Sequence, residues 1–272
     1  MELPAGGRRA YAYTGGRPFD PTLPCIVFLH GALHDHSVWT LLARWAAHHG
    51  HAVLAVDEPG HGRSEGPPLP DVESIAEWTL ALLDAADVQQ AVLVGHSMGS
   101  LVALEAAARA PQRISGLVMI AMAYPMKVSD ALFATAREAP LKAIDMVNAF
   151  SFSSTAAKPA YPGPGAWLHG ANRMLMRRMQ AKDAGINLFL HDFGVCDRYA
   201  NGLQAAAQVA CPVDMVLGER DQMTLPKGTR EIAQALRARI TTLAGGHSLM
   251  QELPDAVLQA LRAALARPEA PP

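Results

Sequence analysis

The sequence predicts an α/β protein with a mostly parallel, twisted central sheet and helices on both faces. Short apolar runs, typical of buried strands, recur along the 272 residues, and segments with helical composition lie between most of them. This alternation stops once, between residues 124 and 208, and then resumes. Strands joined by helical crossovers pair in parallel, so the pattern predicts one such sheet with an insertion.

Five strands are predicted before the interruption. The first alternates weakly and precedes a Gly-Gly turn, whereas the other four are continuous apolar runs, as expected of strands buried on both faces. The five strands cover residues 8–13, 25–29, 52–56, 91–94 and 116–122. Helices are expected at residues 37–49, after residue 71 and at 101–109. Ser37 and Asp71 are placed to cap the first two.

After the interruption the alternation continues to the end of the chain. Strands are predicted at residues 213–217 and 240–243, with helices at about 227–237 and 254–266. We therefore expect residues 1–123 and 209–272 to form the core of the protein. Residues 124–208, with helical fragments and a Gly/Pro-rich loop, are expected to form a helical cap or lid. It would lie at the carboxyl edge of the sheet, where open α/β sheets bind ligands.

Composition narrows the classes of partner. A net charge of −2 gives no reason to expect a nucleic-acid partner, and no apolar run approaches the length of a membrane span. The three cysteines are scattered, and the first residues lack the apolar core of a secretory signal, so a cytoplasmic location is expected. A small molecule is the expected partner. The sequence does not choose between a monomer and a homodimer.

The most informative motif is the pentapeptide GHSMG, from Gly95 to Gly99. It lies between a predicted strand and a predicted helix, where a serine would occupy a sharp, strained turn that brings its hydroxyl out of the sheet. The two glycines allow the close backbone approach that such a turn needs. The following helix directs its amino terminus, which favours negative charge, at the same point. We predict that Ser97 is a nucleophile.

A serine hydroxyl needs a base to become a useful nucleophile, and the base needs a group that orients it. Asp221 follows the first strand after the interruption, and His247 follows the second. Because parallel strands end at the same edge of a sheet, both side chains are expected near Ser97. Glu219 is an alternative to Asp221 as the orienting carboxylate.

With these motifs in their order and spacing, the chain resembles the capped, carboxylesterase-like serine hydrolases of the α/β-hydrolase fold. The resemblance rests on HG, DEPGHGRS, GHSMG, GERDQMT and GGHSLMQELP, which begin at residues 30, 57, 95, 218 and 245. It implies that Ser97 is the nucleophile, His247 the general base and then acid, and Asp221 the orienting group. It also implies an oxyanion hole formed by the backbone N–H groups of Ala32 and Met98. No cofactor or metal is implied.

The resemblance implies hydrolysis of carboxylic esters through an acyl-enzyme, with short to medium acyl groups in an apolar pocket. Other chemistry on this fold stays open: hydrolysis of thioesters, lactones, amides or carbon–carbon bonds, perhydrolysis, or lyase activity. A non-catalytic ligand receptor is the alternative from another class. Methionine and aromatic residues crowd the insertion, and a cap must face its substrate. The expected substrate contacts are Leu33, Tyr124, Met126, Phe150 and Trp167.

Several histidines have both a structural and a functional interpretation. His96 is adjacent to the nucleophile and could act as a base, although packing at the turn is favoured, and His30 is expected to support the oxyanion loop. His34 and His36 form an H-x-H pair, but no carboxylate or cysteine lies at metal-binding spacing, so no metal site is predicted. His61 is expected, with Arg63, to order its own turn.

A basic run occupies one predicted helix of the insertion. It consists of Arg173, Arg177, Arg178 and Lys182. A solvated helix face is the favoured interpretation, and recognition of an anionic substrate or carrier group is the alternative.

Overall fold

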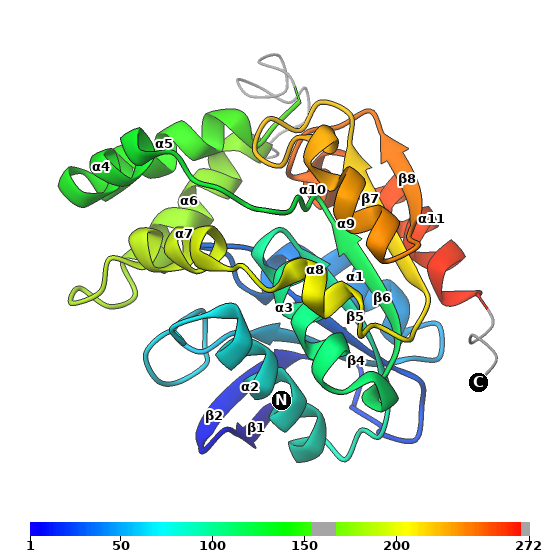
Figure 1. The fold of residues 1–272 in the computed structure, drawn as a ribbon. Coiled ribbons are helices and arrows are strands. Elements are labelled where there is room, and N and C mark those ends of the chain that lie inside the picture. The colour runs from blue at the N-terminus through cyan, green and yellow to red at the C-terminus, as the bar shows by residue number, and fades with distance from the viewer. Residues whose placement is uncertain (154–166, 268–272) are drawn as a thin grey trace.

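The computed structural model describes residues 1–153 and 167–267, and within them the chain forms one eight-stranded sheet (Figure 1). The strand order is β1-β2-β4-β3-β5-β6-β7-β8. β1 (Glu2–Ala5) and β2 (Arg8–Tyr13) pair antiparallel, and β2 also runs antiparallel to β4. The other strands run parallel to one another: β3 (Cys25–Leu29), β4 (Ala52–Asp57), β5 (Ala91–His96), β6 (Ile114–Ile120), β7 (Val213–Gly218) and β8 (Arg239–Leu243). The predicted α/β architecture with a mostly parallel sheet is confirmed.

Two apolar clusters lie on opposite faces of this sheet. In β3, Val27 and Leu29 belong to one cluster, whereas Ile26 and Phe28 belong to the other, because successive side chains of a strand point to opposite faces. The Val27 face is covered by α2 (Val72–Ala85), α3 (Met98–Arg109), α8 (Gly202–Ala206) and α9 (Arg230–Ala235). The Phe28 face is covered by α1 (Thr40–Ala47), α10 (Leu249–Glu252) and α11 (Pro254–Leu265).

Four helices of the insertion form a separate layer with an apolar cluster of its own. They are α4 (Asp130–Glu138), α5 (Pro140–Phe150), α6 (Leu168–Gln180) and α7 (Leu188–Arg198). Figure 1 shows them together on one side of the sheet. The next helix, α8, packs on α3, and its Ala205 and Ala206 belong to the core cluster. α8 thus packs with the core, although it lies within the range expected for the insertion. The Gly/Pro-rich loop lies outside the described residues.

Local differences from the expected elements have local causes. The expected helix at 37–49 begins as a 3₁₀ turn, η1 (His36–Trp39), and Asp35 caps it by accepting the Ser37 N–H at 2.9 Å, so Ser37 is not the cap. Asp71 caps α2 as predicted, by accepting the Ser74 N–H at 2.7 Å. Two further 3₁₀ turns, η2 (Pro111–Arg113) and η4 (Pro226–Thr229), begin at prolines; η4 takes the first residues of the helix expected at 227–237. In the described ranges, no helix is both long and apolar enough to cross a bilayer.

Candidate active site

The turn that holds Ser97 joins β5 directly to α3. Ser97 has a φ of 52° and a ψ of −116°, a conformation that L-residues rarely adopt and that costs about 1–3 kcal/mol. A Cβ on Gly95 would collide with the Gly99 carbonyl oxygen, and one on Gly99 would collide with the carbonyl oxygen of Leu29. The backbone is held by the Ser97 N–H, which donates to Ile120 O at 2.9 Å. Both glycines are therefore needed for the close approach that the motif predicts.

His247 and Asp221 follow β8 and β7, and the structure brings them together. His247 Nδ1 donates to Asp221 Oδ2 at 2.9 Å, and both side chains are buried. Thr224 Oγ1 also donates to Asp221 Oδ2, at 2.6 Å, and lies 3.2 Å from His247 Nδ1. Burial alone would raise the pKa of Asp221, but the charge of His247 and the hydrogen bonds outweigh it and lower the pKa to about 2. Glu219 is exposed, so Asp221 is the carboxylate placed to orient the imidazole.

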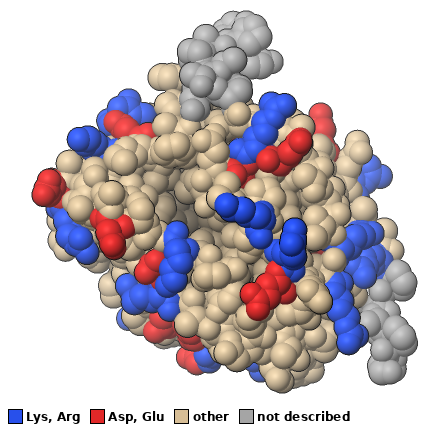
Figure 2. All heavy atoms as spheres, turned by 45° about the horizontal axis from the view of Figure 1, so that its top comes forward, with Lys and Arg blue, Asp and Glu red and all other residues tan. Residues whose placement is uncertain are grey.

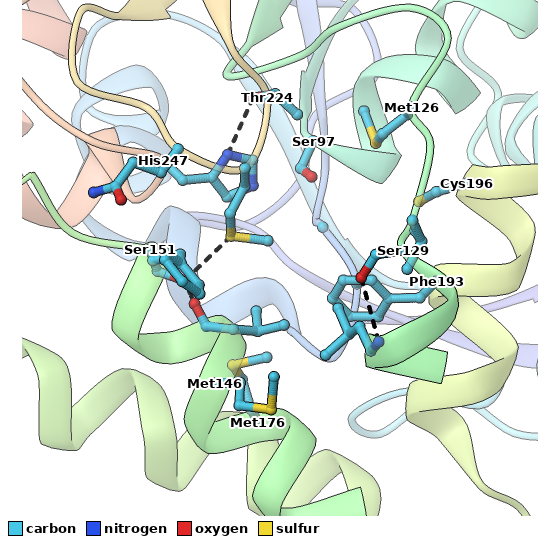
Figure 3. A pocket seen from close by; sticks show the side chains of 18 of the residues that line it. Ser97, Met126, Ser129, Met146, Ser151, Met176, Phe193, Cys196, Thr224 and His247 are labelled. Atoms are coloured by element: carbon cyan, nitrogen blue, oxygen red, sulfur yellow. Dashed lines mark hydrogen bonds between the residues drawn. The ribbon is translucent and has the colours of Figure 1, made fainter. Parts of the chain in front are cut away.

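Ser97 and His247 line the same cavity, and Figure 3 shows both side chains at its wall. Among the described residues, no hydrogen bond joins Ser97 Oγ to the His247 ring. Such bonds are commonly longer without a bound substrate and shorten when one binds. The two side chains can therefore act on one ligand at the cavity wall.

The loop after β3 lies against the serine. A Cβ on Gly31 would lie 2.9 Å from His96 Nδ1 and 3.3 Å from Ser97 Cβ, so the absence of a side chain lets this backbone approach. The next residue, Ala32, lines the cavity, and Met98 is the first residue of α3. The two N–H groups implied by the resemblance thus belong to the loop and the helix terminus that flank Ser97.

His30 and His96 both bind backbone groups near this loop. His30 Nδ1 donates to Gly31 O at 2.9 Å, and its Nε2 accepts the Glu58 N–H at 3.1 Å, as expected of a support for the loop. His96 Nε2 donates to the carbonyl of His247 at 3.0 Å, and burial lowers the pKa of His96 well below its usual value. This placement fits the packing interpretation of His96.

The cavity has a volume of about 240 Å³ and lies between the core and the cap (Figure 3). Cap helices and loops supply most of its apolar wall: Met126, Val128, Leu132, Met146, Val147, Phe150, Met176, Phe193 and Cys196. Met223, from the loop after β7, also contributes. On α5, Met146, Val147 and Phe150 follow the spacing of one helix face. That spacing was the sequence signal for Met146 and Val147, which the expected contacts did not include.

Two of the five expected substrate contacts, Met126 and Phe150, line the cavity, and the other three do not. Leu33 is fully buried in the cap cluster. Tyr124 packs against Gly202 and against Tyr199, with ring centroids 5.9 Å apart. Trp167 is half exposed at the start of α6, beside His169. The side chains of Leu33 and Tyr124 are held by packing that the sequence did not indicate.

The basic run of α6 and of the turn after it makes intramolecular bonds, although the Arg178 side chain is still 62% exposed. Arg173 and Arg177 both bind Asp145 of α5. Arg178 binds Asp35 at 2.5 Å, and Lys182 Nζ donates to the carbonyl oxygens of His61 and Ser64. These contacts join α6 to the neighbouring cap helix and to the core. On the face in Figure 2, basic and acidic side chains are interspersed and form no single broad patch of one sign.

The remaining histidines of the sequence analysis take separate partners. His34 Nε2 donates to Asn172 Oδ1 at 2.8 Å, whereas His36 Nδ1 donates to Asp57 Oδ1 at 2.7 Å. The H-x-H pair is thus divided between the cap and the last residue of β4. Arg63 follows the expectation for its turn: its N–H donates to Asp57 Oδ2 at 2.7 Å. His61 does more than order the turn, because its Nε2 donates to Asp192 of α7 at 2.9 Å.

Comparison with known proteins identifies relatives of this chain. The family described as the alpha/beta hydrolase family matches residues 26–260. The first curated relatives match over only 96 to 102 residues, 26–34% of their own length. The pimeloyl-[acyl-carrier protein] methyl ester esterase of Serratia marcescens is 40% identical over 96 residues, which is 35% of each chain.

Two further comparisons extend over most of the chain. RutD of Klebsiella pneumoniae, which carries the name of a carbamate hydrolase, is 25% identical over 242 residues, 84% of this chain and 86% of RutD. The crystal structure of the enol-lactonase from Burkholderia xenovorans superposes with a TM-score of 0.81 at 23% identity, covering 98% of this chain and 100% of that one. This structural likeness is a likeness of fold.

Proposed function

Because the chain belongs to the alpha/beta hydrolase family, we propose that it is a serine hydrolase that cleaves neutral carboxylic esters with short to medium acyl groups. One observation carries the proposal. Ser97, on its strained turn, lines the same apolar cavity as His247, whose Nδ1 donates to the buried Asp221 carboxylate. This arrangement supports roles for Ser97 as the nucleophile, His247 as the base and Asp221 as the orienting group of an acyl transfer.

Acylation follows from these positions. Ser97 Oγ attacks the ester carbonyl carbon while His247 Nε2 takes the hydroxyl proton, and Asp221 stabilises the imidazolium that forms. The carbonyl oxygen, now an oxyanion, accepts hydrogen bonds from the N–H groups of Ala32 and Met98. When the tetrahedral species collapses, the carbon–oxygen bond to the alcohol breaks and His247 gives its proton to the leaving oxygen.

Deacylation repeats the sequence with water. His247 takes a proton from a water molecule that attacks the acyl carbon of the ester on Ser97. The second tetrahedral species collapses, the bond to Ser97 Oγ breaks, and the proton returns to Oγ through His247. The products are the carboxylic acid and the free enzyme.

The composition of the cavity wall favours a substrate with a neutral, apolar acyl group. Its cap side consists mainly of thioether, aliphatic and aromatic side chains, which suit irregular apolar ligands. Lys127 is the one cationic residue among the described lining residues, and its Nζ donates to the Asp197 carbonyl at 2.6 Å. The similarity to a methyl ester esterase agrees with ester cleavage.

Labelling and turnover test the proposal together. A fluorophosphonate probe should label the wild type and fail to label Ser97→Ala, and p-nitrophenyl esters should be hydrolysed only when Ser97 is present. Ser151→Ala is the matched control, because Ser151 lines the same cavity but its hydroxyl donates to Val147 O. Absence of both labelling and turnover in the wild type would refute the hydrolase and favour a ligand receptor. Labelling that survives in Ser97→Ala would refute the nucleophile.

Carbamate hydrolysis is a second candidate, favoured by the similarity to RutD over most of both chains. The same acyl-transfer steps apply to a carbamate carbonyl. Esters and carbamates of one alcohol, compared at equal concentration, separate the two. A higher kcat/KM for the carbamate would make it the preferred substrate class.

A further inference from the structure

A buried carboxylate of the cap contacts the loop that carries Ala32. Asp192 lies on α7 and is 1% exposed. Its Oδ2 accepts the Leu33 N–H at 2.8 Å and the His61 Nε2–H at 2.9 Å, and its Oδ1 lies 3.1 Å from His191 Nδ1. One side chain of the insertion therefore binds the loop after β3 and the turn after β4.

The loop needs such a restraint at Leu33. Leu33 has a φ of +57°, in the left-handed region that residues with a side chain rarely occupy. A strained residue keeps its conformation only where its surroundings hold it from several directions. Here the side chain is fully buried in the cap cluster, and the N–H is bound by Asp192. Both restraints come from the insertion.

The two peptide groups on either side of Ala32 are held in different ways. The Gly31 carbonyl accepts the His30 Nδ1–H at 2.9 Å and the His34 N–H at 3.2 Å. Because a peptide group is planar, fixing this carbonyl also fixes the direction of the Ala32 N–H. The following peptide group is held through the Leu33 N–H by Asp192. Removing the Asp192 carboxylate would free one of the two supports of the Ala32 backbone.

The charge of Asp192 is balanced by His61, to which it is hydrogen-bonded. His61 donates through Nε2 to Asp192, and its Nδ1 lies 3.2 Å from Pro59 O, which can only accept, so the ring is an imidazolium. Burial alone would lower the pKa of His61, but the charge and hydrogen bond of the Asp192 carboxylate outweigh it and raise the pKa to about 9. His30, Glu58 and His61 place ligand atoms within 4.8 Å of one another, but both nitrogens of each ring already have hydrogen-bond partners. The hydrogen bonds of His30 and His61 therefore support the surrounding backbone.

We infer that Asp192 is a positioning residue that holds the Ala32 N–H in place for the oxyanion through its bond to Leu33. The inference rests on the proposed hydrolase function. Asp192 acts through the loop backbone and does not line the cavity. Its contribution should consequently appear in the stabilisation of the transition state and not in the binding of the apolar acyl group.

Three variants test this role. Asp192→Leu removes the acceptor at nearly constant volume, whereas Asp192→Asn keeps an oxygen that can accept the Leu33 N–H. Asp145→Leu is the matched control, because Asp145 is a cap carboxylate whose partners, Arg173 and Arg177, lie on α6 and not in the loop. Should Asp192→Leu not fold, the pair Asp192→Leu with His61→Leu removes both charges and leaves no unpaired ion in the core.

We expect Asp192→Leu to lower kcat by about 10- to 100-fold with KM little changed, since a shift of roughly 1 Å in a catalytic group can cost about 100-fold. Asp192→Asn should keep most of the activity, and Asp145→Leu should match the wild-type kcat. A trifluoromethyl ketone, whose adduct with serine places an oxyanion in the hole, should bind more weakly to Asp192→Leu by about the same factor as kcat falls. The affinity for an apolar alcohol inhibitor should stay constant. Assays run well below each melting temperature.

The outcomes separate the inference from the function on which it rests. An unchanged kcat in folded Asp192→Leu, or equal losses of affinity for the ketone and the alcohol, would overturn the positioning role. A wild type that neither turns over esters nor reacts with the probe would refute the proposed function and the inference together.

Discussion

Glu58 is a buried carboxyl group whose two oxygens have no hydrogen-bond partner among the described residues. The side chain is 1% exposed and lies beside His61. Burial raises the pKa of Glu58 to about 8; the charge of His61 opposes this shift, and that of Asp192 adds to it. The neutral form of Glu58 therefore fits this site better than the ionised form.

This shift predicts a loss of stability at alkaline pH. The folded-state pKa of about 8 exceeds the ordinary value of 4.5, so the contribution of Glu58 is complete below about pH 4.5 and is lost as the pH rises to 8. Between pH 6 and 8 the ionisation of Glu58 should lower the unfolding free energy of the wild type by on the order of 2 kcal/mol. The unfolding free energy of Glu58→Gln should fall less over the same range. Denaturant titrations at each pH measure the difference, with the exposed Glu219→Gln as control. Parallel pH profiles for wild type and Glu58→Gln would contradict the prediction.

The two acidic residues after β7 should differ sharply in their effect on turnover. Asp221→Asn should lower kcat by about 10³- to 10⁴-fold, because the amide no longer holds the imidazole in its reactive tautomer. Glu219→Gln should leave kcat within about twofold of the wild type, since exposed substitutions rarely disturb a buried site. Steady-state kinetics of both variants on one ester shows which of the two carboxylates orients His247. A large loss in Glu219→Gln would reverse the assignment.

At the scale of the element, the turn between β5 and α3 depends on contact between backbones. Gly95 and Gly99 leave no room for a methyl group, so the strand, the helix and β3 meet there without side chains between them. This requirement is local, and a short sequence motif can express it. The Asp71 cap of α2 and the buried parallel strands were predictable for the same reason.

A methyl group at Gly99 should therefore destabilise the protein. Gly99→Ala would push a Cβ into the backbone carbonyl of Leu29, and we expect a loss of about 3 kcal/mol. Gly116→Ala is the matched control, because a Cβ on Gly116 meets only the Val92 side chain at 3.4 Å. Thermal or chemical unfolding compares the two. Equal stability of both variants would mean that the turn can relax.

Other elements were not predictable because contacts distant in sequence determine them. β1 has only four residues and exists through its pairing with β2. α8 follows the insertion along the chain, but it packs on α3 in the core. Leu33 follows the motif HG and suggested a substrate contact, yet its conformation is set by Asp192, 159 residues later. Spacing along the chain does not carry information of this kind.

At the scale of the whole molecule, the cavity is formed where the insertion meets the sheet. The core supplies Ser97 and His247, which motifs identified, and the cap supplies the apolar wall. Only part of that wall was predictable, because each cap residue faces the cavity or the cap cluster according to how four helices pack.

The size of the cavity predicts the response to acyl length. Each added methylene that enters the cavity should raise kcat/KM by about fourfold, from roughly 0.8 kcal/mol of burial, until the cavity is full. Phe150→Ala enlarges the cavity and should move the optimal acyl length to longer chains. Leu141→Ala is the control, because Leu141 is exposed on the same helix and does not line the cavity. A series of p-nitrophenyl esters measures the profile, and an optimum unmoved by Phe150→Ala would contradict this account.

The methionines of the cavity wall also make it sensitive to oxidants. Met126, Met146, Met176 and Met223 line the cavity that Ser97 also lines. Oxidation to the sulfoxide would turn each apolar contact into a polar one. A peracid formed in this cavity by perhydrolysis would contact the methionine thioethers before it reached solvent. Repeated turnover would therefore oxidise the methionines of the cavity wall. Peptide mass spectrometry after turnover with peroxide should find sulfoxides at these methionines before the exposed Met174, and the enzyme should lose activity toward long acyl groups first.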